Sequence, residues 1–329
     1  MKKYIIPLLL ASMALIGCEA NKGSSEEVKD FDRSSLSIIT PTGAPALAFY
    51  NYAGLSNFET NSVPTNIVAM MAAGQKDVAV LPTNAGIQAI TGKNAPYQIA
   101  ATITFGNFYI ASLGNDANET MDAGDNILLF QKGNVPDKIF HYVYGDTFDS
   151  NIYYVSAVSD AAAALMSGSF TDADTGTTVV PNYVMVAEPV LTNVLSKKEN
   201  VSVYADMQAK YKEKSGNKEL FQASVFIKNS VDKELATSFL SSLKKDIEDA
   251  IAEPTKLSEG MAKEEAAAEV FGVAPAMAEA VLKKNNGMGL GFKYAKENKE
   301  AIETFLALFN IKDIDEKVYF SLGKGQSPE

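Results

Sequence analysis

Several residue types are nearly absent from this chain of 329 residues, and each absence narrows its chemistry. The chain has one cysteine, Cys18, one histidine, His141, and no tryptophan. A single cysteine excludes a disulfide within the chain and a cluster of thiolate metal ligands. A metal site or a Ser-His catalytic pair would depend on His141 alone. That residue lies in an amphipathic run at residues 138–143 and is typical of a structural or surface histidine, so no metal site is expected.

Arginine is almost missing as well. Arg33 is the single arginine among the 29 lysine and arginine residues. A carboxylate, sulfonate or phosphate held by two parallel hydrogen bonds needs a guanidinium group. Arg33 lies in a segment that we expect to be a tail, so it is not available for this role. A bound anion would have to be held by lysine, by hydroxyl groups or by backbone N–H groups.

The overall charge excludes one class of partner. The formal net charge is −11, whereas nucleic-acid binding needs a basic face, so no nucleic-acid partner is expected. Apolar residues make up 47% of the chain and charged residues 21%. These proportions are those of a folded globular protein, and the length is enough for two domains of ordinary size.

The first residues have the pattern of an export signal. Two lysines are followed by a short apolar run up to Ile16, and Gly17 precedes Cys18. The run is too short to span a bilayer as a permanent helix, so we interpret residues 1–17 as a signal peptide. Residues 18–34 are polar and are predicted to form a flexible tether.

Strand and helix patterns alternate through the rest of the chain. This alternation predicts an α/β fold with mixed, mainly parallel sheets flanked by helices. We expect the chain to pass between two domains and back. The expected domains are residues 35–120 plus 222–329, and residues 121–221. Residues 168–182 are rich in turn formers and are predicted to be a surface insertion.

The strongest pattern is a strand-to-helix junction that occurs twice. Pro-Thr-Gly-Ala at 41–44 and Pro-Thr-Asn-Ala at 82–85 each join an apolar run to an Ala-rich helical pattern. Residues 156–160 and 188–189 are two further junctions of small or polar residues. Ligands bind beyond the carboxyl ends of strands in open α/β sheets, where helix starts offer unpaired N–H groups. The set predicts a ligand site between two facing domains, although each junction alone is also compatible with an ordinary helix cap.

Catalytic motifs are scarce. The chain has no nucleophile elbow, no HExxH pair and no phosphate-binding P-loop. Glu188 is the carboxylate that stands out, because it ends an apolar strand and precedes Pro189. Its side chain either points into the predicted crevice or caps the next helix, and the sequence leaves both interpretations open.

Several short motifs occur in an order that is known from one family. Leu-Ile-Gly-Cys at 15–18 resembles the lipobox of bacterial lipoproteins. It is followed by the junction at 41–45, by Asp-Val-Ala-Val-Leu-Pro at 77–82 and by Val-Met-Val-Ala-Glu-Pro at 184–189. In this order the motifs resemble the substrate-binding lipoproteins of ABC importers, in the nitrate, sulfonate and thiamine-precursor branch of the type II periplasmic-binding fold. Residues 168–182 depart from the family's pattern.

The resemblance implies a two-lobed protein with a hinge, no enzyme activity and no cofactor. It also implies capture of a small molecule and its transfer to an ABC permease and its ATPase. The protein would be extracytoplasmic and anchored to the cell membrane by acylated (palmitoylated) Cys18. An enzyme on the same fold that acts on a small cofactor precursor, or a sensor or adhesin without a transporter, are the alternatives. The ligand-binding positions that the resemblance implies are Thr42, Gly43, Ala44, Thr83, Asn84, Asn107, Tyr109, Ser159, Asp160 and Glu188.

Overall fold

The structure is a computed structural model that describes residues 31–114, 120–146, 148, 151–284 and 286–323. Residues 31–329 form one compact unit. The predicted signal peptide, Cys18 and most of the predicted tether lie outside the described residues. Among the helices of the described residues, none combines the length and the apolar character that crossing a bilayer requires.

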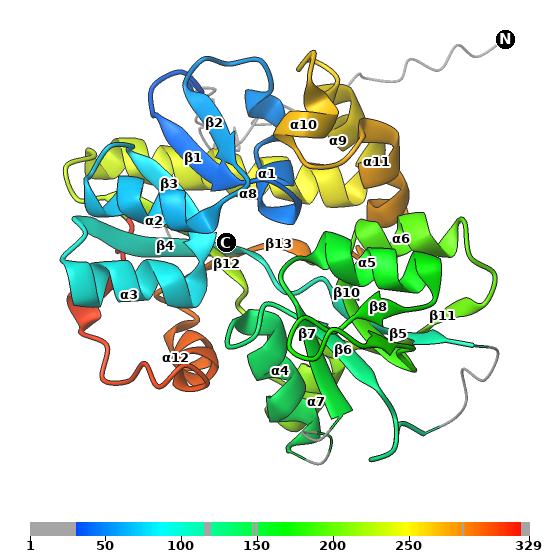
Figure 1. Cartoon of the computed structure of the whole chain (residues 1–329). Coiled ribbons are helices and arrows are strands. Elements are labelled where there is room, and N and C mark those ends of the chain that lie inside the picture. The colour runs from blue at the N-terminus through cyan, green and yellow to red at the C-terminus, as the bar shows by residue number, and fades with distance from the viewer. Residues whose placement is uncertain (1–30, 115–119, 147, 149–150, 285, 324–329) are drawn as a thin grey trace, which may run out of the picture. The chain divides into compact units, whose positions relative to one another are not determined.

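Six strands form the first sheet. They are β1 (Ile38–Pro41), β2 (Phe58–Asn61), β3 (Val78–Pro82), β4 (Tyr97–Thr104), β12 (Ala223–Lys228) and β13 (Leu290–Tyr294). Their order across the sheet is β13–β4–β12–β3–β1–β2 (Figure 1). β1 is parallel to β2 and β3, whereas β12 is antiparallel to both β3 and β4, and β13 is antiparallel to β4. The sheet is therefore mixed, as the sequence predicts. It is not mainly parallel, because the returning strand β12 and the edge strand β13 make three of its five strand pairs antiparallel.

Five strands form the second sheet. They are β5 (Phe108–Leu113), β6 (Ile127–Phe130), β7 (Ile152–Val155), β10 (Tyr183–Ala187) and β11 (Val201–Asp206). Their order is β11–β5–β10–β6–β7. β6 is parallel to β7 and β10, and β5 is antiparallel to β10 and β11.

The membership of β5 corrects the expected position of the first crossing. We expected the chain to stay in the first domain up to residue 120, because the polar residues 114–125 resemble a linker. Instead, β4 belongs to the first sheet and β5 already belongs to the second. Three residues, 105–107, make the crossing, and Gly106 has φ +96°, a backbone conformation that favours glycine.

Helices cover both faces of each sheet. Those around the first sheet are α1 (Ala44–Leu47), α2 (Pro64–Ala72), α3 (Thr83–Lys93), α8 (Lys233–Ala252), α9 (Pro254–Met261), α10 (Ala267–Val270), α11 (Pro275–Lys283) and α12 (Lys299–Ala307). Those around the second sheet are α4 (Val135–Tyr144), α5 (Val158–Ser167), α6 (Val190–Leu195) and α7 (Met207–Lys214). Two short 3₁₀ turns, η1 (Tyr50–Tyr52) and η3 (Glu316–Val318), complete the first group.

β3 shows how the sequence divides the core. Val78 and Val80 pack into the apolar cluster beneath α1, α8, α9 and α11, whereas Ala79 and Leu81 pack into the cluster beneath α2, α3 and α12. Successive side chains of a strand point to opposite faces, so a run that is apolar at every position has to be buried on both.

Two segments differ from the sequence-based expectation. Residues 31–34 were expected in the tether, yet the rings of Phe31 and Phe239 lie 5.8 Å apart and Arg33 pairs with Asp246 of α8. Residues 287–291 were expected to be a flexible glycine-rich turn, yet β13 begins at Leu290 and pairs with β4. In both cases the segment gains its order from a partner far away in the sequence.

The predicted insertion at residues 168–182 is a small hairpin. It contains β8 (Phe170–Thr171) and β9 (Thr178–Val179), which pair in antiparallel fashion. The ring of Phe170 lies 5.5 Å from that of Tyr153 in β7, and this contact holds the hairpin against the second sheet.

A glycine in α3 makes a stability prediction that depends on this packing. A Cβ on Gly86 would lie 2.1 Å from the ring of Phe226, which is fully buried in β12. We expect Gly86→Ala to lower the free energy of unfolding by about 2 kcal/mol, because overpacking outweighs the helix propensity that alanine adds. Urea unfolding followed by circular dichroism measures this change.

Gly92 in the same helix is the matched control for Gly86. A Cβ there would meet no atom within 4 Å, so Gly92→Ala should leave stability unchanged or raise it by up to about 1 kcal/mol. Equal effects of the two substitutions would contradict the close packing of α3 on β12.

Candidate ligand-binding site

A cavity of about 350 Å³ lies beyond the carboxyl ends of strands from both sheets. Pro41 ends β1, Pro82 ends β3, Phe130 ends β6 and Ala187 ends β10, and all four residues line the cavity. This is the edge at which open α/β sheets bind ligands. The volume is at the small end of the range for pockets that hold small molecules.

The junction between β1 and α1 forms one wall. Thr42, Gly43 and Ala44, three of the predicted ligand-binding positions, all line the cavity. Gly43 has φ +97° and its N–H donates to the carbonyl of Phe271 at 3.0 Å. Gly272 also lines the cavity, and a Cβ on it would lie 3.0 Å from the nitrogen of Gly43. The loop before α11 and the loop before α1 therefore support each other through backbone contact.

The threonine of the second Pro-Thr junction is outside the lining of the cavity, unlike the threonine of the first. Thr83 is fully buried, and its hydroxyl lies 2.7 Å from that of Ser224, which in turn lies 2.8 Å from the hydroxyl of Thr102. This hydroxyl is used inside the first sheet, and Pro82 is the residue of the junction that lines the cavity. Asn84 is also buried, and its Oδ1 has no hydrogen-bond partner within the described part of the chain.

Asn107 connects the two crossings of the chain. Its Nδ2 donates to the carbonyl of Glu188 at 2.9 Å, and its Oδ1 accepts from Nε2 of Gln222 at 3.1 Å. Its own carbonyl accepts from the N–H of Glu188 at 3.0 Å. Asn107 and Glu188 were predicted site residues, and both line the cavity. Gln222 was not predicted, because its only signal is its place just before the returning strand β12.

The carboxylate of Glu188 caps a helix. Its Oε2 accepts from the N–H of Thr192 at 2.9 Å, and its Oε1 accepts from the hydroxyl of Thr192 at 2.7 Å. The structure thus favours the second of the two interpretations that the sequence left open. The residue still lines the cavity, but both of its side-chain oxygens are already paired with the first turns of α6.

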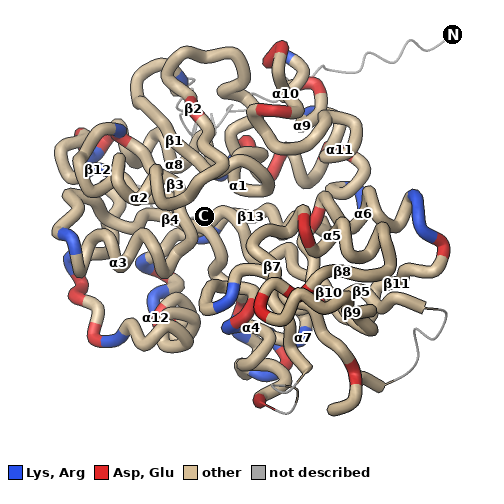
Figure 2. Tube along the Cα trace, in the orientation of Figure 1, with Lys and Arg blue, Asp and Glu red and all other residues tan. Residues whose placement is uncertain are grey.

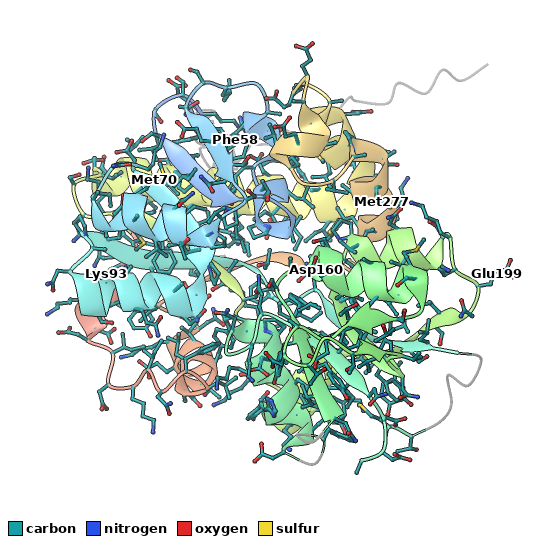
Figure 3. The ribbon with its side chains drawn as sticks, viewed as in Figure 1. Phe58, Met70, Lys93, Asp160, Glu199 and Met277 are labelled. Atoms are coloured by element: carbon teal, nitrogen blue, oxygen red, sulfur yellow. The ribbon has the colours of Figure 1, made fainter. Side chains whose placement is uncertain are left out.

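Besides Thr83 and Asn84, three further predicted site residues lie outside the lining of the cavity. The hydroxyl of Tyr109 donates to the carbonyl of Gly287 at 3.2 Å, and burial, more than the carboxylates of Asp206 and Glu188, raises the pKa of this phenol. Asp160 lies at the start of α5 (Figure 3), where its carboxylate accepts from the N–H of Ala157 at 3.0 Å. Ser159 is its neighbour, and Val158 is the residue of this junction that lines the cavity.

The floor of the cavity is apolar and was largely missed by sequence reasoning. The rings of Phe108 and Phe130 meet edge to face at 5.9 Å, and both line the cavity. The other lining residues that were not predicted are Pro45, Pro64, Gln131, Val135, Pro136, Val190 and Ala223. No lysine or arginine is among the described residues that line it.

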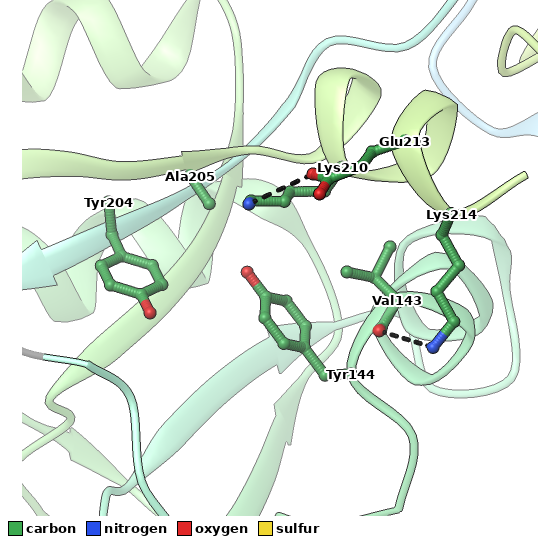
Figure 4. A pocket seen from close by; sticks show the side chains of 7 residues that line it. All are labelled: Val143, Tyr144, Tyr204, Ala205, Lys210, Glu213 and Lys214. Carbon is green, nitrogen blue, oxygen red and sulfur yellow. Dashed lines mark hydrogen bonds and ion pairs between the residues drawn. The ribbon is translucent and has the colours of Figure 1, made fainter. Parts of the chain in front are cut away.

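A larger hollow of about 580 Å³ lies elsewhere, on the flank of the second sheet. Figure 4 shows Tyr144 and Tyr204 on its wall, with Lys210 paired to Glu213 at 3.5 Å and Lys214 donating to the carbonyl of Val143 at 3.1 Å. Among the described residues, its walls come from α4, β11 and α7. Because no strand end and no crossing contributes to it, the smaller cavity is the better candidate for the predicted site.

Comparison with solved structures identifies the fold of the chain. No family model and no curated protein matches the sequence. The chain is similar to a structure described as an ABC transporter from Parabacteroides distasonis, at 17% identity and a TM-score of 0.64, over 88% of this chain and 98% of that one. It is similar to the periplasmic aliphatic sulphonate binding protein SsuA from Escherichia coli, at 10% identity and a TM-score of 0.60, over 89% and 96%.

A third similar structure is the ligand-binding component of an ABC-type import system from Staphylococcus aureus, which has zinc bound. It shares 10% identity and a TM-score of 0.60, over 87% of this chain and 95% of that one. In this chain, the described residues include no group of three or more His, Cys, Asp or Glu side chains that could hold a metal ion. At these identities the likeness is one of fold. The described chain has the α/β periplasmic-binding-protein fold, with two mixed sheets flanked by helices and a returning strand, β12, inserted between β3 and β4.

Proposed function

We propose that this chain is an extracytoplasmic solute-binding protein that captures a small molecule and delivers it to the permease and ATPase of an ABC importer. The observation that carries the proposal is the cavity whose lining comes from strand ends in both sheets. A ligand there contacts both lobes at once and so favours the arrangement in which they close around it. Lobe one comprises the first sheet and its helices, and lobe two comprises the second sheet and its helices.

The chemistry of the lining supports binding over catalysis. Thr42 carries the one hydroxyl among the lining residues, and no Cys, His or Lys is among them. Glu188 is the one carboxylate there, and Thr192 occupies both of its oxygens. A general acid, base or nucleophile needs a side chain that is free to react with the substrate. The lining favours ligand capture, and the enzyme alternative remains the one to exclude by experiment.

Ligand capture predicts a protein that is stabilised by one class of small molecule. A ligand at 100 times its Kd adds about 2.7 kcal/mol to the free energy of unfolding. We therefore expect thermal-shift screening with thiamine precursors, flavins, nitrate, alkylsulfonates and small carboxylates to find a compound that raises the Tm saturably. Small-angle scattering with that compound should show a smaller radius of gyration.

Two results would count against this function. Stabilisation without any compaction would contradict the closing of two lobes around the ligand. Chemical conversion of the bound compound, followed by mass spectrometry, would favour the enzyme on the same fold.

We also propose that Cys18, which lies outside the described residues, carries the lipid that anchors the protein. Its position after a short apolar run supports this. A lipid on Cys18 would hold the protein at the membrane, since an acyl chain adds about 0.8 kcal/mol of membrane affinity per buried CH₂. We expect Cys18→Ala to move the protein from the membrane fraction to the soluble fraction and to abolish labelling by a palmitate analogue. Ser24→Ala is the control and should change neither. Labelling that persists in Cys18→Ala would show that the anchor is elsewhere.

A further inference from the structure

The charge of the cavity lining argues against an anionic ligand. None of the described residues that line it carries a positive charge, and its one carboxylate is Glu188. Figure 2 shows α1, whose start forms one wall, without any charged residue. The formal net charge of the chain is −11, so the field of the whole protein also opposes the approach of an anion.

Several of the helix starts around the cavity are unfavourable for an anion. An anion at a helix start is bound by the free N–H groups of the first turn. Pro45 is at the second position of α1, Pro64 at the first of α2 and Pro136 at the second of α4, and proline has no N–H. Carboxylates stand at the starts of α5 and α6, where Asp160 accepts from the N–H of Ala157 and Glu188 accepts from the N–H of Thr192, and their charge opposes a bound anion.

The amide of Gln222 leaves one buried acceptor at the cavity. Because Nδ2 of Asn107 donates to the carbonyl of Glu188, its Oδ1 must accept, and the amide of Gln222 must donate to it through Nε2. This chain of bonds fixes the orientation of both amides. It leaves Oε1 of Gln222 buried beside the cavity with no partner in the described residues.

A second unpaired buried oxygen belongs to Asn84, which is outside the lining of the cavity. Asn84 follows the lining residue Pro82 by two positions, and its Oδ1 is also without a partner in the part of the chain that the structure describes. A buried acceptor that lacks a partner costs about 1–3 kcal/mol. A ligand that donates hydrogen bonds would recover this cost, whereas an anion, which is itself an acceptor, would not.

We propose that the ligand is an uncharged organic molecule that donates an N–H hydrogen bond to Oε1 of Gln222 and packs its apolar part on Phe108 and Phe130. This inference rests on the proposed ligand capture and specifies its substrate class. It disfavours an anionic ligand, because no lysine or arginine is among the described lining residues and the unpaired oxygen of Gln222 is an acceptor, as an anion is.

The first test compares two sets of probes on the purified full chain. One set is a fragment library of uncharged heterocyclic amines and amides, and the other contains nitrate, methanesulfonate, ethanesulfonate and phosphate. We expect a saturable rise in Tm with a member of the first set and none with the second. Methylation of the donor nitrogen in the best probe should weaken its Kd about 10-fold or more, as measured by calorimetry.

The second test uses matched glutamine variants. Gln222→Leu removes the acceptor and should weaken the best uncharged probe about 10-fold or more. Gln208 is the control, since its Oε1 is also buried without a partner in the described residues but it lies outside this cavity, and Gln208→Leu should bind like the wild type. The probe methylation does not depend on the folding of any variant.

The outcomes separate this inference from the proposed function. Saturable binding of an anion instead of the uncharged probes would overturn the substrate class and leave ligand capture intact. An uncharged probe that binds equally well after N-methylation, and equally well to Gln222→Leu, would overturn the hydrogen bond to Gln222. No saturable binding in either set would contradict both the inference and the proposed function.

Discussion

Replacing Arg33 with alanine is expected to lower the free energy of unfolding by about 3 kcal/mol at pH 7. The guanidinium of Arg33 donates to Oδ1 and Oδ2 of Asp246 at 2.9 and 3.1 Å. Asp246 is 5% exposed, and its one other side-chain partner among the described residues is the amide of Asn51, at 2.8 Å. The substitution therefore leaves a buried carboxylate with most of its charge uncompensated. Urea unfolding followed by circular dichroism measures the loss.

The pH dependence of this loss has a definite sign. Burial raises the pKa of Asp246 above 3.8, although Arg33 and Asn51 oppose that rise. A carboxyl whose folded pKa is raised binds its proton more tightly in the folded state, so stability falls as the pH rises through that range. Without Arg33 the pKa rises further. The deficit of Arg33→Ala relative to the wild type should therefore be larger at pH 7 than at pH 4.

A surface pair is the control for this prediction. Lys245 pairs with Asp249 at 2.6 Å on the exposed side of α8, and Lys245→Ala should cost less than about 1 kcal/mol. If Arg33→Ala costs no more than Lys245→Ala, or costs the same at both pH values, the pairing of Arg33 with Asp246 does not stabilise the fold as described.

Gly289→Ala is expected to lower the free energy of unfolding by about 3 kcal/mol or more. Gly289 has φ +62°, and a Cβ on it would lie 1.9 Å from the carbonyl oxygen of Gly106. Gly106 lies in the crossing between β4 and β5, and Phe105 donates its N–H to the carbonyl of Gly289 at 2.8 Å. The clash is with backbone, which cannot move aside as a side chain can.

The position of this contact adds a functional consequence. Residues 105–107 join the two lobes, so a displaced backbone there should also weaken ligand binding and the compaction that accompanies it. Gly176→Ala is the matched control, because Gly176 has φ +70° and a Cβ there would meet no atom within 4 Å. It should cost only about 1–2 kcal/mol of backbone strain. Equal losses for the two variants would show that strain, and not the contact with Gly106, determines the effect.

The candidate site was predictable in part. Pro-Thr-Gly-Ala at 41–44 and Glu188–Pro189 place their residues at the cavity, because the carboxyl ends of parallel strands share one edge of a sheet. Pro-Thr-Asn-Ala at 82–85 has nearly the same letters but a different outcome, since Thr83 turns into the sheet towards Ser224. Similar local sequences thus produced one wall of the cavity and one buried hydrogen-bond network.

Periodicity and turn residues by themselves determined the fold class, most strands and helices, and the edge at which the site lies. These features depend on contacts that are close in sequence or on the two-residue repeat of a strand. The tertiary structure decided the rest. It paired Arg33 with an aspartate 213 residues away, gave β5 to the second sheet, and oriented Gln222 through Asn107. No local pattern encodes these pairings, because each depends on which distant polar group or strand edge the fold places within reach of the residue.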